Sequence, residues 1–374
     1  MVNPVIPELL GCEFPILAFS HCRDVVAAVS AAGGFGVLGA TKFTPQELEI
    51  ELSWIDEHSG RRPYGVDMLI PHKYQKAPSR AEGEAKIPAE HRHFLIDLLD
   101  RYGVPDIDSD TNEGHKGLKA SDPAETAREL LDVAFRHPIK LVASALGPPP
   151  GDIVDQCHSK DVLVTGLAGK VEHAVRQKEA GVDFVVTTGY EAGGHTGEIT
   201  TMVLVPDVVD AVGPLPVVAA GGIATGRQVA AAIALGAAGV WTGSVWTTTD
   251  EAETHPMLRQ KMLTATASDT VRSRCMSGKT VRLLKSDWTE SWDEPSAPSP
   301  LPMPLQAMLV NDFRGRIDHA ARRPDDGATK LLTGPVGQVV GRLNAIRPAR
   351  QVLLEMAEEY ADTIAGFAKL DAGE

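Results

Sequence analysis

Short apolar runs alternate with amphipathic stretches along the first two thirds of the chain. The runs are rich in Val, Ile, Leu and Ala, and most of them end in a glycine or a polar turn. Continuous runs of this kind are typical of parallel strands that are buried on both faces. We predict eight strands, at residues 15–20, 36–40, 64–71, 139–145, 162–166, 184–188, 216–220 and 239–243.

The stretches between the runs carry helix signals. Thr44 is followed by Pro45 and, three residues on, by Glu47, which is the pattern of a capping box at a helix start. Other helices are expected at 23–32, 89–102 and 122–137. The regular alternation of strand and helix predicts an α/β fold, a closed (β/α)8 barrel of the TIM type. A doubly wound parallel sheet is the alternative.

Two regions interrupt this alternation. Residues 72–122 are polar, so we predict an insertion after the third strand that lies over the mouth of the barrel. Beyond residue 250 the rhythm stops, and a proline-rich connector at 296–304 cannot join a helix or sheet interior. Helices are expected there at 255–264, 305–322 and 348–369. We therefore divide the chain into a barrel at residues 1–250 and a helical cap with a C-terminal extension at 251–374, packed on the barrel.

Composition narrows the class of protein. Apolar residues make up 43% of the 374 positions and charged residues 23%, which is ordinary for a soluble protein with a large core. The net charge is −14 and basic residues are scattered, so neither nucleic acid nor a membrane is expected as a partner. The four cysteines are also scattered. From the pattern of the N-terminal residues and of the apolar runs, we expect neither a signal peptide nor a membrane-spanning segment. We expect free thiols and a cytoplasmic location.

One acidic segment resembles the start of a calcium-binding loop. Asp106, Asp108 and Asp110 alternate as EF-hand ligands do, but Thr111 stands where the sharp turn needs glycine and Gly117 where a bidentate glutamate is needed. We interpret the segment as a solvated acidic loop. The histidines show no ligand-like spacing either, so no metal is expected.

The strand at 184–188 delivers a glycine-rich loop, Gly189-Tyr190-Glu191-Ala192-Gly193-Gly194-His195-Thr196-Gly197. Its glycines allow the backbone to approach a ligand closely, and His195 places one titratable ring beside that ligand. Glu191 is expected to organise the loop. The alternative for His195 is a structural histidine bonded to the loop backbone.

Two further turns predict a phosphate site. The segment Ala220-Gly221-Gly222-Ile223-Ala224-Thr225-Gly226 opens a helix after the seventh strand, and Gly243-Ser244 follows the eighth. Glycines let backbone N–H groups converge, and a helix N-terminus adds partial positive charge. Barrels of this class often bind phosphate after strands seven and eight. The alternative is two ordinary tight turns.

These motifs, together with Gly236-Ala237-Ala238-Gly239-Val240, resemble the nitronate monooxygenase (2-nitropropane dioxygenase) family. The family shares a superfamily with the flavin-dependent enoyl-ACP reductases, and the resemblance extends from residue 15 to about residue 348. It implies FMN at the C-terminal mouth of the barrel. The implied phosphate contacts are the N–H groups of Gly221, Gly222, Gly243 and Ser244, and Ala220 is a further implied cofactor-binding residue. Gly193 and Gly194 would pass close to the flavin, and His195 would be the catalytic base that removes the α-proton of a nitroalkane or fixes an anionic nitronate.

The sequence departs from the family pattern at two strand ends. The first strand ends in Ala18-Phe19-Ser20-His21-Cys22 where the family has an Ala-Pro-Met turn beneath the flavin. The third carries Asp67 where the family has an asparagine facing the flavin pyrimidine. A carboxylate accepts a hydrogen bond from flavin N3–H but cannot donate one, and its charge would disfavour an anionic reduced flavin.

Three residues are candidates for the substrate side of the flavin. His21 and Cys22 follow the first strand, where barrel residues tend to be functional, although a buried cysteine and a helix-capping histidine are the alternative. Gln338, in the segment 337–341, would bring the C-terminal cap back onto the mouth.

The expected activity is that of an FMN-dependent oxidoreductase that oxidises alkyl nitronates with O2 to a carbonyl compound and nitrite. The first alternative is an NAD(P)H-dependent flavin ene-reductase or dehydrogenase acting on an acyl-CoA or acyl-ACP thioester. A binding module whose flavin is structural or lost is the second. The sequence defines neither the physiological substrate nor the oligomeric state, and it is compatible with a homo-oligomer.

Overall fold

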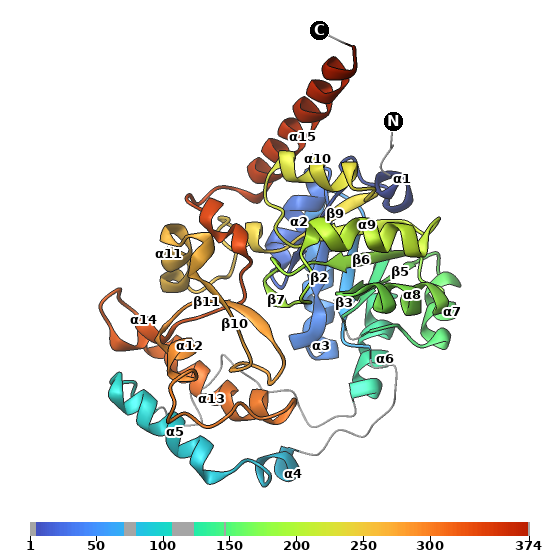
Figure 1. The fold of residues 1–374 in the computed structure, drawn as a ribbon. Coiled ribbons are helices and arrows are strands. Elements are labelled where there is room, and N and C mark those ends of the chain that lie inside the picture. The colour runs from blue at the N-terminus through green and yellow to red at the C-terminus, as the bar shows by residue number, and fades with distance from the viewer. Residues whose placement is uncertain (1–4, 71–79, 107–122, 146, 373–374) are drawn as a thin grey trace.

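The computed structural model describes residues 5–70, 80–106, 123–145 and 147–372. At its centre eight parallel strands form a closed barrel (Figure 1). They are β1 (Ile16–Ser20), β2 (Phe35–Gly39), β3 (Tyr64–Met68), β4 (Leu141–Ser144), β5 (Leu163–Ala168), β6 (Phe184–Thr188), β8 (Val217–Ala220) and β9 (Gly239–Thr242). Pairing of β9 with β1 closes the sheet. The predicted barrel is confirmed, and the doubly wound alternative is wrong.

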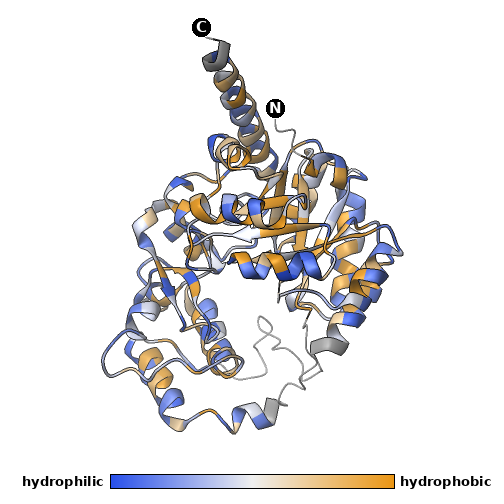
Figure 2. Ribbon diagram, turned by 45° about the vertical axis from the view of Figure 1, so that its right-hand side comes forward, coloured by the Kyte–Doolittle hydropathy of each residue, from blue (hydrophilic) through white to orange (hydrophobic). Residues whose placement is uncertain are grey.

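Helices surround the barrel and follow its strands. They are α2 (Arg23–Ala31), α3 (Pro45–His58), α6 (Pro123–Ala134), α7 (Gly151–His158), α8 (Val171–Glu179), α9 (Thr201–Val212) and α10 (Gly226–Ala234), with the short α1 (Ile6–Leu10) before β1. Side chains alternate along each strand. Inward residues such as Phe35, Leu141 and Phe184 fill the barrel, and their neighbours pack outward against the helices. Both faces of the strands are therefore apolar, as Figure 2 shows by the hydrophobic colour of the barrel strands.

The predicted capping box of α3 is present. The Thr44 hydroxyl accepts a hydrogen bond from Glu47 N at 3.2 Å, and the Glu47 carboxylate accepts one from Thr44 N at 2.8 Å. We expect Thr44→Ala to lower the free energy of unfolding by about 1 kcal/mol, measured by urea denaturation. Thr200 begins α9 without a side-chain cap, so Thr200→Ala is the matched control. An equal loss in both variants would contradict the prediction.

The C-terminal part contains helices and, in addition, a small antiparallel sheet. The helices are α11 (Pro256–Thr264), α12 (Asp287–Ser291), α13 (Leu305–Ala320), α14 (Gly327–Leu331) and α15 (Ala349–Ala372). The sheet joins β10 (Thr270–Ser273) and β11 (Val281–Leu284) to β7 (Gly194–His195), which belongs to the glycine-rich loop. Neither β10 nor β11 was predicted. Each of these strands has only four residues and contains an arginine, so neither forms a continuous apolar run that would predict a strand.

The described part of the insertion, α4 (Arg80–Glu84) and α5 (Ala89–Arg101), lies beside this C-terminal part in Figure 1. Leu95, Leu98 and Leu99 of α5 share one apolar cluster with Trp288 of α12 and Leu309 of α13. The remainder of the insertion, including the acidic loop, lies outside the described residues.

Helix α15 packs on the opposite side of the molecule, against α10 and α2, and its end projects beyond the barrel (Figure 1). Within the described part of the chain, no helix is long and apolar enough to cross a bilayer.

Candidate active site

Glu191 fixes the glycine-rich loop at the C-terminal mouth of the barrel. Its carboxylate accepts hydrogen bonds from the backbone N and from Oγ1 of Thr201, both at 2.9 Å. At the start of the loop, Gly189 N donates to Ala220 O at 2.9 Å. These bonds join the loop after β6 to the turn after β8 and to the start of α9. The organising role expected for Glu191 is what its contacts support.

A segment of the C-terminal part closes over this loop. Gly337 N donates to Ser244 Oγ at 2.8 Å, and Gln338 N donates to Glu191 O at 3.0 Å. Gln338 begins the 3₁₀ helix η5 (Gln338–Arg342). The structure therefore brings Gln338, Ser244 and the glycine-rich loop together, which is the arrangement that the sequence predicted for residues 337–341.

The packing between this segment and Gly193 leaves no room for a side chain. A Cβ on Gly193 would lie 2.7 Å from Gly337 N. We expect Gly193→Ala to lower the free energy of unfolding by about 1–3 kcal/mol through overpacking, measured by urea denaturation. Gly151→Ala is the matched control, because a Cβ there meets no atom within 4 Å. Equal stability of the two variants would sink this prediction.

The turns after β8 and β9 present unused backbone donors. The N–H groups of Gly221, Gly222, Ile223 and Ser244 donate to no acceptor among the described residues. Gly221 and Gly222 have φ of +100° and +72°, a conformation that favours glycine. Thr225 then caps α10 through Gln228 N. Converging free N–H groups at the start of a helix suit a phosphate.

His195 lies at the solvent-facing edge of the site. Its Nε2 is 2.9 Å from Ser277 Oγ, in the hairpin turn between β10 and β11. Partial burial of the ring, and then the charge of Lys279, lower the pKa of His195 below its ordinary value. The imidazole is therefore neutral at neutral pH and can accept a proton.

Asp67 is buried inside the upper end of the barrel, with 4% of its surface exposed. Its strand neighbours, Gly39 on β2 and Ala143 on β4, have little or no side chain. Oδ1 of Asp67 is buried without a hydrogen-bond partner among the described residues. Burial raises the pKa of the carboxyl to about 8. A carboxyl with a pKa raised in this way favours its protonated form near neutral pH, and the protonated group both donates and accepts hydrogen bonds.

The end of β1 contributes aromatic rings to the same mouth. Phe19 points inward and stacks on Trp241 of β9 at a centroid distance of 5.9 Å. His21 meets the edge of Phe19 at 5.1 Å, and its Nδ1 is 2.9 Å from Gly39 O. The ring is thus held on β2 rather than at a helix start. Burial lowers the pKa of His21.

Two predicted residues of β1 and its turn point elsewhere. The side chain of Ala18 is fully buried in the apolar cluster between the barrel and its helices. Cys22 belongs to the same cluster, and its thiol donates to Glu251 O at 3.0 Å. Burial raises the pKa of the Cys22 thiol, so it is an inert thiol turned away from the mouth. Ser20 Oγ accepts a hydrogen bond from Cys22 N and shapes this turn.

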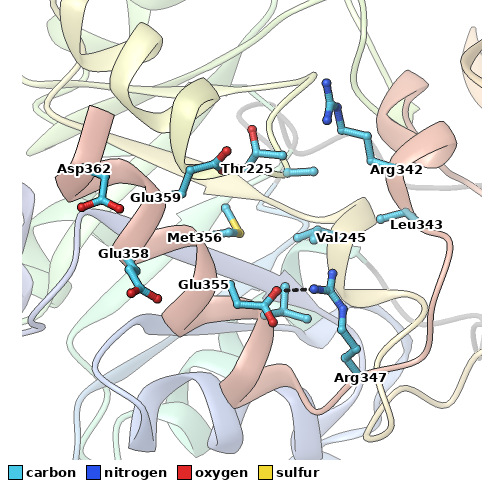
Figure 3. Close-up of a pocket in the computed structure, with 12 residues that line it drawn as sticks. Thr225, Val245, Arg342, Leu343, Arg347, Glu355, Met356, Glu358, Glu359 and Asp362 are labelled. Atoms are coloured by element: carbon cyan, nitrogen blue, oxygen red, sulfur yellow. Dashed lines mark hydrogen bonds and ion pairs between the residues drawn. The ribbon is translucent and has the colours of Figure 1, made fainter. Parts of the chain in front are cut away.

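A cavity of about 440 Å³ begins behind the two turns with free N–H groups (Figure 3). Thr225 and Val245 border it on the barrel side, and α15 forms the opposite wall. Arg347 is paired with Glu355, whereas Arg342 stands apart from that pair in Figure 3 and has no ion pair among the described residues. Neither His195 nor Asp67 lines this cavity.

Sequence reasoning missed the residues that surround His195 from the C-terminal part. Ser277 and Lys279 reach it from a hairpin more than 80 positions away. Arg282 donates to Tyr190 O, and so holds the start of the loop from the same hairpin. No local pattern marks these residues, because the pairing of β11 with β7 joins distant parts of the chain.

The closed barrel of eight parallel strands, with glycine-rich turns after its last two strands, places the chain in the (β/α)8 class. The sequence profile of the nitronate monooxygenase family matches residues 15–359, and the chain belongs to this family. It is accordingly a flavin-dependent oxidoreductase.

The individual relatives agree with this assignment. A Mycobacterium tuberculosis protein named provisionally as a monooxygenase, Rv1533, is 57% identical over 364 residues, 96% of each chain. The solved nitroalkane oxidase of Streptomyces ansochromogenes is 25% identical over 97% of this chain and 99% of that one, with a TM-score of 0.78. FabK of Thermotoga maritima is 26% identical over 99% of this chain and 100% of that one, with a TM-score of 0.73.

Proposed function

We propose that the protein is an FMN-dependent oxidoreductase that oxidises alkyl nitronates with O2 to a carbonyl compound and nitrite. The observation that carries this proposal is the position of His195, on a loop that is hydrogen-bonded to the end of β8, where the turn with free N–H groups begins. The similarity to the solved nitroalkane oxidase of Streptomyces ansochromogenes supports the choice of substrate.

The residues present fit FMN. The free N–H groups of Gly221, Gly222 and Ser244 would hold its phosphate. Oδ1 of Asp67 is buried without a hydrogen-bond partner among the described residues, and the polar edge of the flavin ring would supply one. Phe19 and the stacked Trp241 offer an apolar floor. When bound, FMN would supply the acceptor for two electrons.

His195 is the group that handles the proton. With a neutral nitroalkane it would accept the α-proton at its free ring nitrogen, and with a preformed nitronate it would orient the anion by hydrogen bonding. Partial burial, and then the charge of Lys279, lower the pKa of His195 and favour the neutral ring. The bond from Gln338 N to Glu191 O holds the segment 337–341 against the loop that carries His195.

Anaerobic mixing with the flavin-loaded protein tests this proposal. An alkyl nitronate is expected to bleach the flavin absorbance rapidly, and NAD(P)H is not. Rapid bleaching by NAD(P)H alone would instead support an ene-reductase or dehydrogenase that acts on acyl thioesters. A protein that purifies colourless and does not take up FMN would overturn both.

A further inference from the structure

The hydroxyl of Ser277, in the turn between β10 and β11, contacts His195 from outside the glycine-rich loop. Its Oγ is 2.9 Å from Nε2 of His195. The same oxygen accepts a hydrogen bond from Lys279 N at 3.3 Å, and the hydroxyl donates to Lys279 O, also at 3.3 Å. A serine hydroxyl has one proton to donate and two lone pairs that accept. These contacts therefore bear on which ring nitrogen of His195 carries the proton.

The two neutral tautomers of His195 use this hydroxyl differently. When Nε2 carries the proton, Ser277 Oγ accepts from Nε2 and from Lys279 N, and its proton is donated to Lys279 O. When Nδ1 carries the proton, the hydroxyl has to donate to Nε2 instead. Its bond to Lys279 O is then lost and one lone pair of the oxygen stays empty. The contacts around Ser277 thus favour the tautomer with the proton on Nε2.

Nδ1 is the ring nitrogen that remains for a ligand. In the part of the chain that the structure describes, it forms no hydrogen bond. In the favoured tautomer of His195, Nδ1 has a lone pair and no proton, so it can accept one. Once it has done so the ring is a cation. The bond from Nε2–H to Ser277 Oγ then becomes stronger, because its donor is charged.

The turn that carries Ser277 is tied to the proline-rich connector at 296–304 by the side chain of Gln306. This glutamine lies at the start of α13 and is fully buried. Its Oε1 accepts a hydrogen bond from Leu301 N at 2.8 Å, and its Nε2 donates to Cys275 O at 2.9 Å. The amide therefore joins the connector to the turn two residues before Ser277.

The other side of the turn is fixed as well. Gly278 has a φ of +83°, and a Cβ on it would lie 2.7 Å from Met303 N of the connector. Val281, at the start of β11, pairs with His195 of β7. The serine hydroxyl and the imidazole are thus held in place by backbone pairing on one side and by close packing on the other.

We propose that Ser277 is a positioning residue that keeps the proton of neutral His195 on Nε2 and so makes Nδ1 the atom that receives the α-proton of the substrate. The Cα–H bond of the nitroalkane breaks and an N–H bond forms at Nδ1. The electron pair of the broken bond stays on the substrate, which becomes the nitronate. The inference rests on the proposed function, and it assigns a part in that reaction to a residue 82 positions from the base.

Nitrogen-15 NMR of the FMN-loaded protein, at pH 8 and without substrate, measures the tautomer. Two-bond 1H–15N correlation spectra separate a ring nitrogen that carries a proton from one that does not. The chain has 12 histidines, and the signals that disappear in His195→Asn assign those of His195. We expect protonated Nε2 and unprotonated Nδ1 in the wild type. A ring that carries its proton on Nδ1, or on both nitrogens equally, would overturn the proposal.

Substitutions at Ser277 assign the tautomer to its hydroxyl. Ser277→Ala is expected to give a mixture of both tautomers, whereas Ser277→Thr keeps the hydroxyl and the Nε2-protonated ring. Ser159→Ala is the matched control, because that hydroxyl donates to Gln156 O at the end of α7. Its spectrum should show the wild-type signals of His195. The same signals in Ser277→Ala would show that the serine does not set the tautomer.

Two further measurements distinguish positioning from a purely structural role. Ser277→Ala loses the hydrogen bond to the cationic ring, so the pKa of His195, read from the same spectra, should fall, and Ser277→Thr should restore it. Anaerobic flavin reduction by a neutral nitroalkane should slow about tenfold in Ser277→Ala and recover in Ser277→Thr. An unchanged or raised pKa in Ser277→Ala would contradict the proposed bond.

Failure of the positioning role and failure of the proposed function give different results, because the spectra require no turnover. The expected tautomer in a protein that does not oxidise nitronates removes only the proposed reaction. Nitronate oxidation by a protein whose His195 carries its proton on Nδ1 removes only the role of Ser277.

Discussion

Replacement of His195 by asparagine is expected to slow anaerobic flavin reduction by a neutral nitroalkane by about 10²–10³-fold, because a positioned general base contributes a factor of this order. Asparagine retains hydrogen bonding but cannot accept the proton. A preformed nitronate has already lost that proton, so its rate is expected to fall by less than about tenfold. Stopped-flow absorbance of the flavin measures both rates. Equal losses for the two substrates would refute the base role and leave His195 as a binding residue.

The pH dependence of the nitroalkane reaction gives an independent check. The base is active when neutral, so the rate is lost as pH falls through the pKa of His195. Because that pKa lies below 6.5, the rate should hold at pH 7 and decline only in more acidic solution. Lys279→Met removes a charge that lowers this pKa, and should move the acidic decline to higher pH. An unchanged profile in Lys279→Met would contradict a contribution of the Lys279 charge to this shift.

The barrel was predictable because each strand is buried on both faces and therefore appears as an uninterrupted apolar run. Glycine and capping signals then placed the turns, as the box at Thr44 shows. The loop that contains Glu191 and the turn that contains Gly221 were also predictable, because segments that approach one another closely require glycine, and glycines are visible in the sequence.

The sheet that pairs with this loop was not predictable in the same way. Arg282 is 2% exposed although charged residues are rarely buried, and its burial depends on Tyr190, a residue 92 positions away. β7 itself has only two residues and exists through its pairing with β11. Pairing between such distant segments produces no regular alternation of apolar and polar residues in either of them, so neither is predictable as a strand.

The protonation state of Asp67 could not be inferred from residue identity either. It depends on what lies nearby, and the neighbours are the small residues Gly39 and Ala143 rather than a cation. Similarly, His21 and Cys22 are adjacent in sequence, yet His21 remains at the mouth and Cys22 packs against the helices. A strand end places consecutive side chains on opposite sides.

Asp67→Asn is expected to stabilise the FMN-free protein increasingly as pH rises from about 4 to about 8. The carboxyl has a pKa of about 8 in the folded state against a reference value of 3.8, so the unfolded state releases its proton first. Between these values, each pH unit costs the folded wild type about 1.4 kcal/mol relative to the unfolded state. Below pH 4 both states are protonated and the cost vanishes. Asparagine does not titrate, so its own burial cost is independent of pH.

Urea unfolding of both proteins at pH 4.5, 6 and 8 measures this difference, which should grow by several kcal/mol over the range. Ligand-free protein is required because bound FMN would add its own stabilisation. Asp132→Asn, at an exposed position of α6, is the matched control and should show no such trend. The opposite result is that the free energies of unfolding of wild type and Asp67→Asn differ by the same amount at every pH. That result would show that Asp67 is ionised in the folded protein and that a positively charged or donor group reaches it.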